Sequence, residues 1–159
     1  ERREAVAARR VRDDLYAVNH LAATFFEQSM RGPSAHPLAS YALEELRRRG
    51  LDPSPDAAGS VADALQAFRV GYAPPAWDGL VGYLKRQGVS PVAAEKVGLL
   101  VPRSSGSGFY DRFRHRLMFA VTDVQGRVIA FSGRSLAEPT ADELRPLGLS
   151  PAAGAEVPA

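Results

Sequence analysis

Three arginines within seven residues form the part of this sequence best suited to bind a charged ligand. Residues 110–116 read YDRFRHR. If this stretch is extended, its side chains alternate, so that Arg112, Arg114 and Arg116 share one face at intervals of about 7 Å. Such cations repel one another unless an anion lies across them, and guanidinium groups pair well with phosphate. The pattern favours a polyphosphate or nucleic-acid ligand, although a solvated edge strand protected by its charges also explains it.

Positive charge is concentrated around this stretch. Of the 20 basic residues 18 are arginine, and the formal net charge is +2. Residues 103–134 hold six arginines and two aspartates, a net charge of +4, which leaves −2 for the rest of the chain. A GC-rich genome would also raise the arginine content. The local excess therefore carries more weight than the composition, and it supports an anionic partner for this region.

Other residues could complete a binding surface here. Arg134 follows Gly133 at the end of an expected strand, where a glycine would let a ligand approach, although a plain strand end is an equal alternative. Tyr110 could stack on bases, but an aromatic residue beside a sheet more often belongs to the core. His20 and His115 are expected to be structural.

The sequence has no recognisable catalytic apparatus and no metal site. It contains no phosphate-binding glycine loop, no nucleophile elbow and no pair of acids at a catalytic spacing. Asp111 and Asp123 are the carboxylates nearest the arginines, and we expect Asp123 in a turn. The absence of cysteine excludes disulfides and thiolate-bound zinc, and it suits a reducing cytoplasm. No segment approaches the roughly 18–20 apolar residues of a membrane span, so we expect a cytoplasmic protein with no membrane partner.

Helices are expected to precede a small sheet. An amphipathic stripe of Val11, Leu15, Val18, Ala22 and Phe25 predicts a helix over residues 4–30. Further helices are expected from the spacing of apolar residues and from Pro, Gly and Ser signals at their ends: residues 37–50, 60–68, 77–87 and 91–98. Gly50 closes the first of these helices, and Ser90 caps the last. A capping box of Ser60 and Asp63 opens the helix over residues 60–68, in which Val61, Leu65 and Phe68 are expected to face inward.

The second half of the chain changes to the composition of strands. Residues 69–73 and 99–101 are expected to be short strands, and residues 117–122 and 127–131 are expected to pair as an antiparallel hairpin across a turn that ends in Gly126. The predicted fold class is therefore α+β, with N-terminal helices packed on a small, mainly antiparallel sheet that ends in a β-hairpin. Residues 137–159 are rich in Ala and Pro and predict a poorly ordered C-terminal tail or linker, in which Leu144 to Leu149 dock locally and the last ten residues are mobile.

Several segments together resemble the bacterial replicative DNA primase family. They are residues 69–74 with Trp77 and Asp78, residues 98–100, residues 110–119 and residues 123–134, in the family's order and spacing. The resemblance covers about residues 4–136 and matches the N-terminal part of the RNA-polymerase core. It implies an N-terminal α/β subdomain over residues 1–136, followed by a linker over residues 137–159 towards an absent Toprim subdomain.

This resemblance implies that the chain is one part of an enzyme whose activity needs further domains. The family synthesises short RNA primers on single-stranded DNA template from ribonucleoside triphosphates, and the whole protein contacts the replicative helicase and the single-strand-binding protein at the replication fork. Magnesium or manganese binds the acids of the Toprim subdomain, and zinc binds an N-terminal ribbon. Neither set of ligands is present, so the resemblance implies a fragment of a primase that holds no catalytic residue, no metal and no cofactor, and that is inactive alone.

The resemblance also points to individual residues. Arg49, Arg112, Arg114 and Arg134 look like the family's essential basic positions, which guide template or bind incoming nucleotide, and Arg116 is a weaker candidate. Two departures stand out: Ala120 replaces a usual proline, and an Ala/Pro-rich stretch follows Arg134 where the family has a lysine-bearing segment with an Asn-Ser-Pro motif. Two alternatives remain: a module that docks a protein partner through the apolar stripe of its first helix, and a stand-alone nucleic-acid binder.

Overall fold

The computed structural model of the chain describes residues 1–54 and 59–150, with the backbone alone for residues 11–13. Its helices and strands follow one another in this order: α1 (Arg2–Met30), the 3-10 helix η1 (Pro37–Ala39), α2 (Ser40–Arg48), α3 (Ser60–Ala67), β1 (Gly71–Ala73), α4 (Gly79–Arg86), α5 (Pro91–Lys96), β2 (Leu100–Pro102), β3 (Phe109–Asp111), β4 (Arg116–Thr122), β5 (Val128–Ser135), α6 (Ala141–Leu144) and the 3-10 helix η2 (Arg145–Leu147). This arrangement confirms the α+β class.

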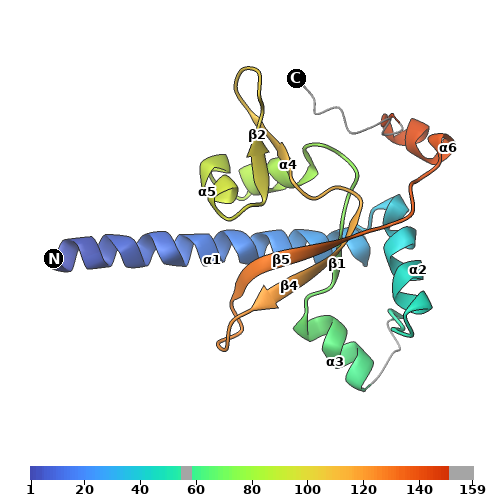
Figure 1. Cartoon of the computed structure of the whole chain (residues 1–159), viewed down its shortest axis with the longest axis horizontal. Helices are drawn as coiled ribbons and strands as arrows, with labels where there is room; N and C mark the ends of the chain where they lie inside the picture. Colours follow the sequence, from blue (N-terminus) through green and yellow to red (C-terminus); the bar gives the residue numbers. More distant parts are fainter. Residues whose placement is uncertain (55–58, 151–159) are drawn as a thin grey trace.

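The long first helix supports the rest of the fold with its C-terminal half. Residues 1–10 are exposed, and this end of α1 extends away from the other elements (Figure 1). Further along, Val18, Ala22 and Phe26 are buried at intervals of four residues, which confirms an apolar stripe. Phe26 is buried in the core, and the expected Phe25 is partly buried and packs against the same core cluster. The side chain of Val11 lies outside the described residues. None of the helices in the described ranges is both long and apolar enough to cross a bilayer.

The second helical segment agrees closely with its sequence signals. It opens as η1 at Pro37 and continues as α2, with Leu38, Ala42 and Leu46 buried. Gly50 adopts φ +77°, and the backbone N–H of Leu51 then donates to the Leu46 carbonyl oxygen at 2.9 Å. This left-handed glycine closes the last turn, as predicted.

Helix α3 and the turn that follows it differ from the prediction. Gly59 is the N-cap and no side chain caps this helix, so the expected capping box of Ser60 and Asp63 is wrong. Phe68 lies just past the end of α3 and is 57% exposed, so its expected inward position is also wrong. The turn into β1 passes through Arg69 at φ +45°, a conformation held by a 2.6 Å ion pair from Arg69 Nη2 to Glu27 Oε1 on α1.

Two antiparallel sheets organise the second half of the chain. The larger has the strand order β1-β4-β5, and the smaller pairs β2 with β3. The predicted hairpin is confirmed as β4 and β5, in which Arg116 lies opposite Ser135 and Leu117 lies opposite Arg134. Asp123 occupies its turn, as expected, and accepts from the backbone N–H groups of Gln125 and Arg127.

The extended geometry considered for residues 110–116 is wrong. Strand β3 ends at Asp111, β4 begins at Arg116, and the two strands belong to different sheets. His115 has φ +49°, a left-handed conformation that turns the chain between them. The three arginines therefore do not form a row on one strand face.

Helices cover both faces of the larger sheet. On one face Met118 and Ala73 join a core cluster with α1, α4 and α5, whereas on the other Leu117 and Tyr72 join a cluster with α2 and α3. This alternation follows from the opposite directions of neighbouring side chains in a strand. It means that the side chains of β4 alternate between the two core clusters.

The segment after β5 packs against the second of these surfaces. Leu144 is buried in the core cluster of α2, which confirms the local docking predicted for residues 144–149. A capping box between Thr140 and Glu143, not anticipated from the sequence, opens α6. The mobility expected of the last ten residues falls on residues 151–159, outside the described part of the chain, apart from Ser150.

Candidate nucleic-acid interface

The five basic residues singled out in the sequence fall into two groups. The connection group, Arg112, Arg114 and Arg116, lies between β3 and β4 and at the first residue of β4. The helix group contains Arg49, at the C-cap of α2, and Arg134 on β5. Arg116 and Leu117 are neighbours on β4, and Arg134 lies opposite Leu117. Arg116 and Arg134 therefore leave the sheet on opposite faces.

A buried histidine fixes the backbone of the connection group. The His115 ring lies between the Tyr72 hydroxyl, 2.6 Å from Nδ1, and the Ala137 carbonyl oxygen, 2.8 Å from Nε2. Because the carbonyl can only accept, Nε2 donates to it, and Nδ1 accepts from the tyrosine in the neutral ring. Burial lowers the pKa of His115, which is consistent with a neutral imidazole. His115 is thus structural, as expected.

Arg114 is held by an aromatic side chain and a main-chain oxygen. Its guanidinium carbon lies 3.7 Å from the centroid of the Trp77 ring, and its Nη1 donates to the Asp111 carbonyl oxygen. Tyr110 meets the Trp77 ring edge to face at a centroid distance of 5.5 Å. Burial lowers the pKa of Arg114, but arginine remains charged at any physiological pH. Base stacking by Tyr110 stays a prediction.

The arginines of the connection group make their hydrogen bonds to main-chain oxygens rather than ion pairs to acids. Arg112 is exposed, and its backbone N–H donates to the Leu99 carbonyl oxygen at 3.0 Å. Arg116 donates from Nη1 to the carbonyl oxygens of Arg114 and His115 at 3.3 and 3.1 Å. Within residues 1–54 and 59–150, no carboxylate forms an ion pair with any of these three arginines. Their charge is therefore available to an external anion.

The helix group surrounds one carboxylate. Glu45 on α2 lies 3.0 Å from Arg49 Nε, 2.7 Å from Arg48 Nη2 and 3.8 Å from Arg134 Nε. The hydrogen bond from Arg49, followed by the charge of Arg48, keeps the pKa of Glu45 below its ordinary value. Three guanidinium groups against one carboxylate leave a net charge of +2. Glu45 was not singled out from the sequence, although its spacing of three residues from Arg48 and four from Arg49 on one helix was a usable signal.

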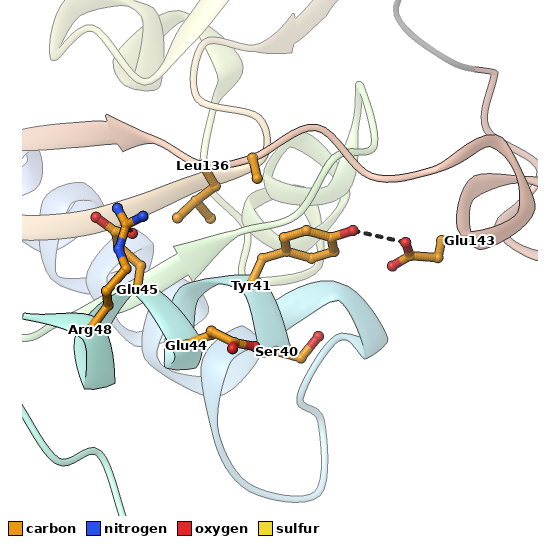
Figure 2. A pocket seen from close by; sticks show the side chains of 8 residues that line it. Ser40, Tyr41, Glu44, Glu45, Arg48, Leu136 and Glu143 are labelled. Atoms are coloured by element: carbon orange, nitrogen blue, oxygen red, sulfur yellow. Dashed lines mark hydrogen bonds and ion pairs between the residues drawn. The ribbon is translucent and has the colours of Figure 1, made fainter.

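A hollow beside the helix group is lined by acidic and basic side chains. It has a volume of about 400 Å³ and lies between α2 and the segment after β5 (Figure 2). Arg48 and Glu45 stand at one side, and at the other the Tyr41 hydroxyl donates to Glu143 at 2.8 Å. Its lining residues are Ser40, Tyr41, Glu44, Glu45, Arg48, Leu136, Ala137 and Glu143. With three glutamates against one arginine, this hollow does not favour phosphate.

Asp111 caps the N-terminus of α4, a structural role that was not predicted from the sequence. Its side chain is buried and accepts from the backbone N–H groups of Leu80, at 2.8 Å, and Val81, at 3.0 Å. The carboxylate thus caps α4 from a distant strand, which its sequence neighbours could not reveal. Burial raises the pKa of Asp111 to about 7, although the two amides favour the charged form.

The Asp111→Asn variant is expected to lose one component of the pH dependence of stability. Between the ordinary pKa of 3.8 and about 7, the folded chain keeps a proton that the unfolded chain has released. The contribution of Asp111 to the free energy of unfolding is therefore greatest below about pH 4 and declines as the pH rises to 7. Denaturant unfolding of both proteins at pH 5 and pH 7.5 should show a larger decline for the wild-type chain.

Comparing the pH dependence of stability in wild type and Asp111→Asn separates the contribution of the Asp111 carboxyl from that of the histidines. His36 and His115, whose pKa values are lowered by burial, contribute stability that is lost as the pH falls below 6.5, but they are the same in both proteins. If the free energy of unfolding changes equally in both proteins between pH 5 and pH 7.5, the Asp111 carboxyl is charged throughout this pH range.

The acidic side chains of this region are already engaged by the protein. Asp111 accepts from backbone amides with both carboxylate oxygens, and Glu45 pairs with arginines through both of its own. Within the described part of the chain, no cluster of three or more His, Asp or Glu side chains is arranged to hold a metal ion. The acids in the described ranges are therefore not arranged to hold a resident divalent metal.

Comparisons with known proteins agree on one family. A family model described as the N-terminal domain of the DNA primase catalytic core matches residues 37–143. The DNA primase of Synechococcus elongatus is 42% identical over 127 residues, which make up 79% of this chain and 16% of that protein. The DNA primase of Deinococcus radiodurans is 37% identical over 133 residues, or 84% of this chain and 20% of that protein. The chain thus spans at most about a fifth of these relatives.

Solved structures give the same result. The catalytic domain of a DnaG primase bound to single-stranded DNA is 35% identical, with a TM-score of 0.64 over 82% of this chain and 38% of that one. The RNA polymerase domain of the Mycobacterium tuberculosis primase DnaG is 31% identical, with a TM-score of 0.66 over 82% of this chain and 37% of that one.

Proposed function

This chain belongs to the family of the DNA primase catalytic core, N-terminal domain, and from that membership we propose that it is the template- and nucleotide-positioning part of a DNA primase. The complete enzyme would join ribonucleoside triphosphates into short RNA primers on single-stranded DNA. Phosphoryl transfer of this kind depends mainly on positioning and on stabilisation of charge. Arg49, Arg112, Arg114 and Arg134, with Arg116 as a weaker member, would provide the positioning.

The connection group carries this proposal. Within the described residues Arg112, Arg114 and Arg116 form no ion pair with an acid, and Arg114 lies on the ring of Trp77, which meets the ring of Tyr110. Cations that neutralise phosphates, next to aromatic rings on which bases can stack, are the combination that proteins use to bind single strands. The helix group, which together with Arg48 gives a net charge of +2 around Glu45, would supply a second site for the template or for the incoming triphosphate.

Catalytic metal would be held outside this chain. We propose that divalent magnesium or manganese, and the zinc of a template-reading domain, belong to other parts of the complete protein, as do its contacts with the helicase and the single-strand-binding protein. This chain would act in the cytoplasm at the replication fork, and alone it would synthesise no primer.

Binding of single-stranded DNA by this chain tests the proposal. A fluorescein-labelled oligonucleotide titrated with the protein should give a dissociation constant in the micromolar range or weaker, and the affinity should fall steeply between 50 and 200 mM salt because each neutralised phosphate releases counterions. The same protein with template, ribonucleoside triphosphates and magnesium should yield no RNA. An affinity that does not change with salt would contradict phosphate contacts, and the absence of binding would favour a protein-docking module.

A further inference from the structure

We infer that Trp77 is a positioning residue, which holds the Arg114 guanidinium in the orientation that contacts the nucleic-acid backbone. This inference rests on the proposed function and deepens it. Trp77 lies in the loop between β1 and α4, 37 residues before Arg114, and only the fold brings the two side chains together.

The geometry of the contact is that of a cation on an aromatic face. A distance of 3.7 Å from the guanidinium carbon to the centroid of the Trp77 ring places the planar group directly over the indole. The Tyr110 ring lies 5.6 Å from the same carbon and supports Trp77 from its edge. Arginine has many rotamers, so a long side chain held on a rigid ring loses less conformational freedom when a ligand binds.

Asp111 fixes Trp77 and Arg114 relative to each other through its main chain. Its backbone N–H donates to the Trp77 carbonyl oxygen at 2.7 Å, and its own carbonyl oxygen accepts from Arg114 Nη1. Its buried carboxyl group holds the first turn of α4, which begins two residues after Trp77. One residue thus joins the ring, the guanidinium group and the helix.

This arrangement leaves part of the guanidinium group for a ligand. The guanidinium group lies over the ring and donates from Nη1 to the Asp111 carbonyl oxygen, and an arginine side chain carries five N–H donors in all. Phosphate oxygens bind arginine in the plane of the guanidinium group. Arg112, which is exposed and lies on no aromatic ring of the described residues, provides the matched comparison within the same connection.

A double-mutant cycle tests the inference. Arg114→Ala is expected to weaken binding of a labelled single-stranded oligonucleotide about fivefold to tenfold, the loss typical of one charge-assisted contact. Trp77→Leu should cause a smaller loss, and Trp77→Leu with Arg114→Ala should be no weaker than Arg114→Ala alone. Trp77→Leu and Arg112→Ala should instead combine additively, because the cation–π contacts of the described residues do not join these two side chains. Trp77→Phe, which keeps an aromatic face, should restore most of the affinity lost in Trp77→Leu.

Fluorescence provides a readout that does not depend on DNA. Trp77 is the only tryptophan of the chain, so its emission reports this contact directly. Arg114→Ala should change the emission of the folded protein and Arg112→Ala should not, with thermal unfolding followed by circular dichroism to show that each variant is folded.

The outcomes separate the two proposals. Additive losses for Trp77→Leu and Arg114→Ala would overturn the inference and indicate that the indole contacts a base itself. Emission that is the same in Arg114→Ala and wild type would also overturn it. If neither Arg112→Ala nor Arg114→Ala weakens DNA binding, the proposed interface fails, whereas the emission of Arg114→Ala still decides whether Arg114 rests on Trp77.

Discussion

Replacement of Arg112 and Arg114 together by alanine is expected to lower the affinity of this chain for single-stranded DNA by at least about tenfold, since two charge-assisted contacts are lost. The dependence of the logarithm of the affinity on the logarithm of salt concentration should become shallower by about 1.4, because each phosphate contact on a single strand contributes about 0.7. Anisotropy titrations at four salt concentrations between 50 and 200 mM give both quantities. In an intact primase that carries this segment, the same pair should abolish primer synthesis.

The control for this experiment removes the same charge elsewhere. Lys85 and Arg86 are exposed in the last turn of α4, at the opposite end of that helix from Asp111. Their replacement by alanine lowers the net charge by the same two units and should leave both the affinity and its salt dependence close to wild type. If the two double variants weaken binding equally, the attraction is a general effect of net charge and the connection group has no special role.

Gly71→Ala is expected to produce the largest loss of stability from a single methyl group. Strand β1 passes so close to α1 that a Cβ atom at Gly71 would lie 2.5 Å from the carbonyl carbon and 2.6 Å from the carbonyl oxygen of Phe26. These are backbone atoms of a helix and cannot rotate away. We expect the free energy of unfolding to fall by about 3 kcal/mol or more, the upper part of the range for overpacked cores. Thermal unfolding should show a midpoint lower by roughly 6–12 °C.

Gly82→Ala provides the matched control. Its new Cβ would meet only Arg86 Nη1, at 3.2 Å, which is the free end of a long side chain on the same helix. Because alanine is also the better helix former, this variant should be as stable as wild type or slightly more stable. A small effect of Gly71→Ala would mean that β1 can move away from α1 without disturbing the core.

Local signals predicted those elements whose ends are set by their own residues. Pro37 and Gly50 mark the two ends of the segment that contains α2, and Gly126, at φ +80°, closes the turn of the β4–β5 hairpin. Each acts through its own backbone angles or its near neighbours. The position of Arg49 at the end of α2 followed from the same reasoning and is confirmed, while its role remains a proposal.

The features that the sequence could not predict depend on distant partners. Residues 110–116 contain the alternation of a strand, yet β3 pairs with β2 and β4 pairs with β1 and β5, so the chain must turn between them at His115. Asp111 caps a helix that begins 32 residues before it, and Arg114 rests on a ring 37 residues away. Periodicity describes one segment at a time, whereas these contacts arise only when separate segments pack.

The segment that leaves β5 is anchored at two points, through the Ala137 carbonyl oxygen on His115 and through Glu143 on Tyr41. Between the first anchor and the Thr140 cap of α6 lie residues 138–139, which belong to none of the core clusters. Extra residues inserted there would enlarge the loop at little entropic expense and leave Arg134 undisturbed. The chain can therefore accommodate a change of length at this point, because the contacts of His115 and Tyr41 hold the segment on either side of it.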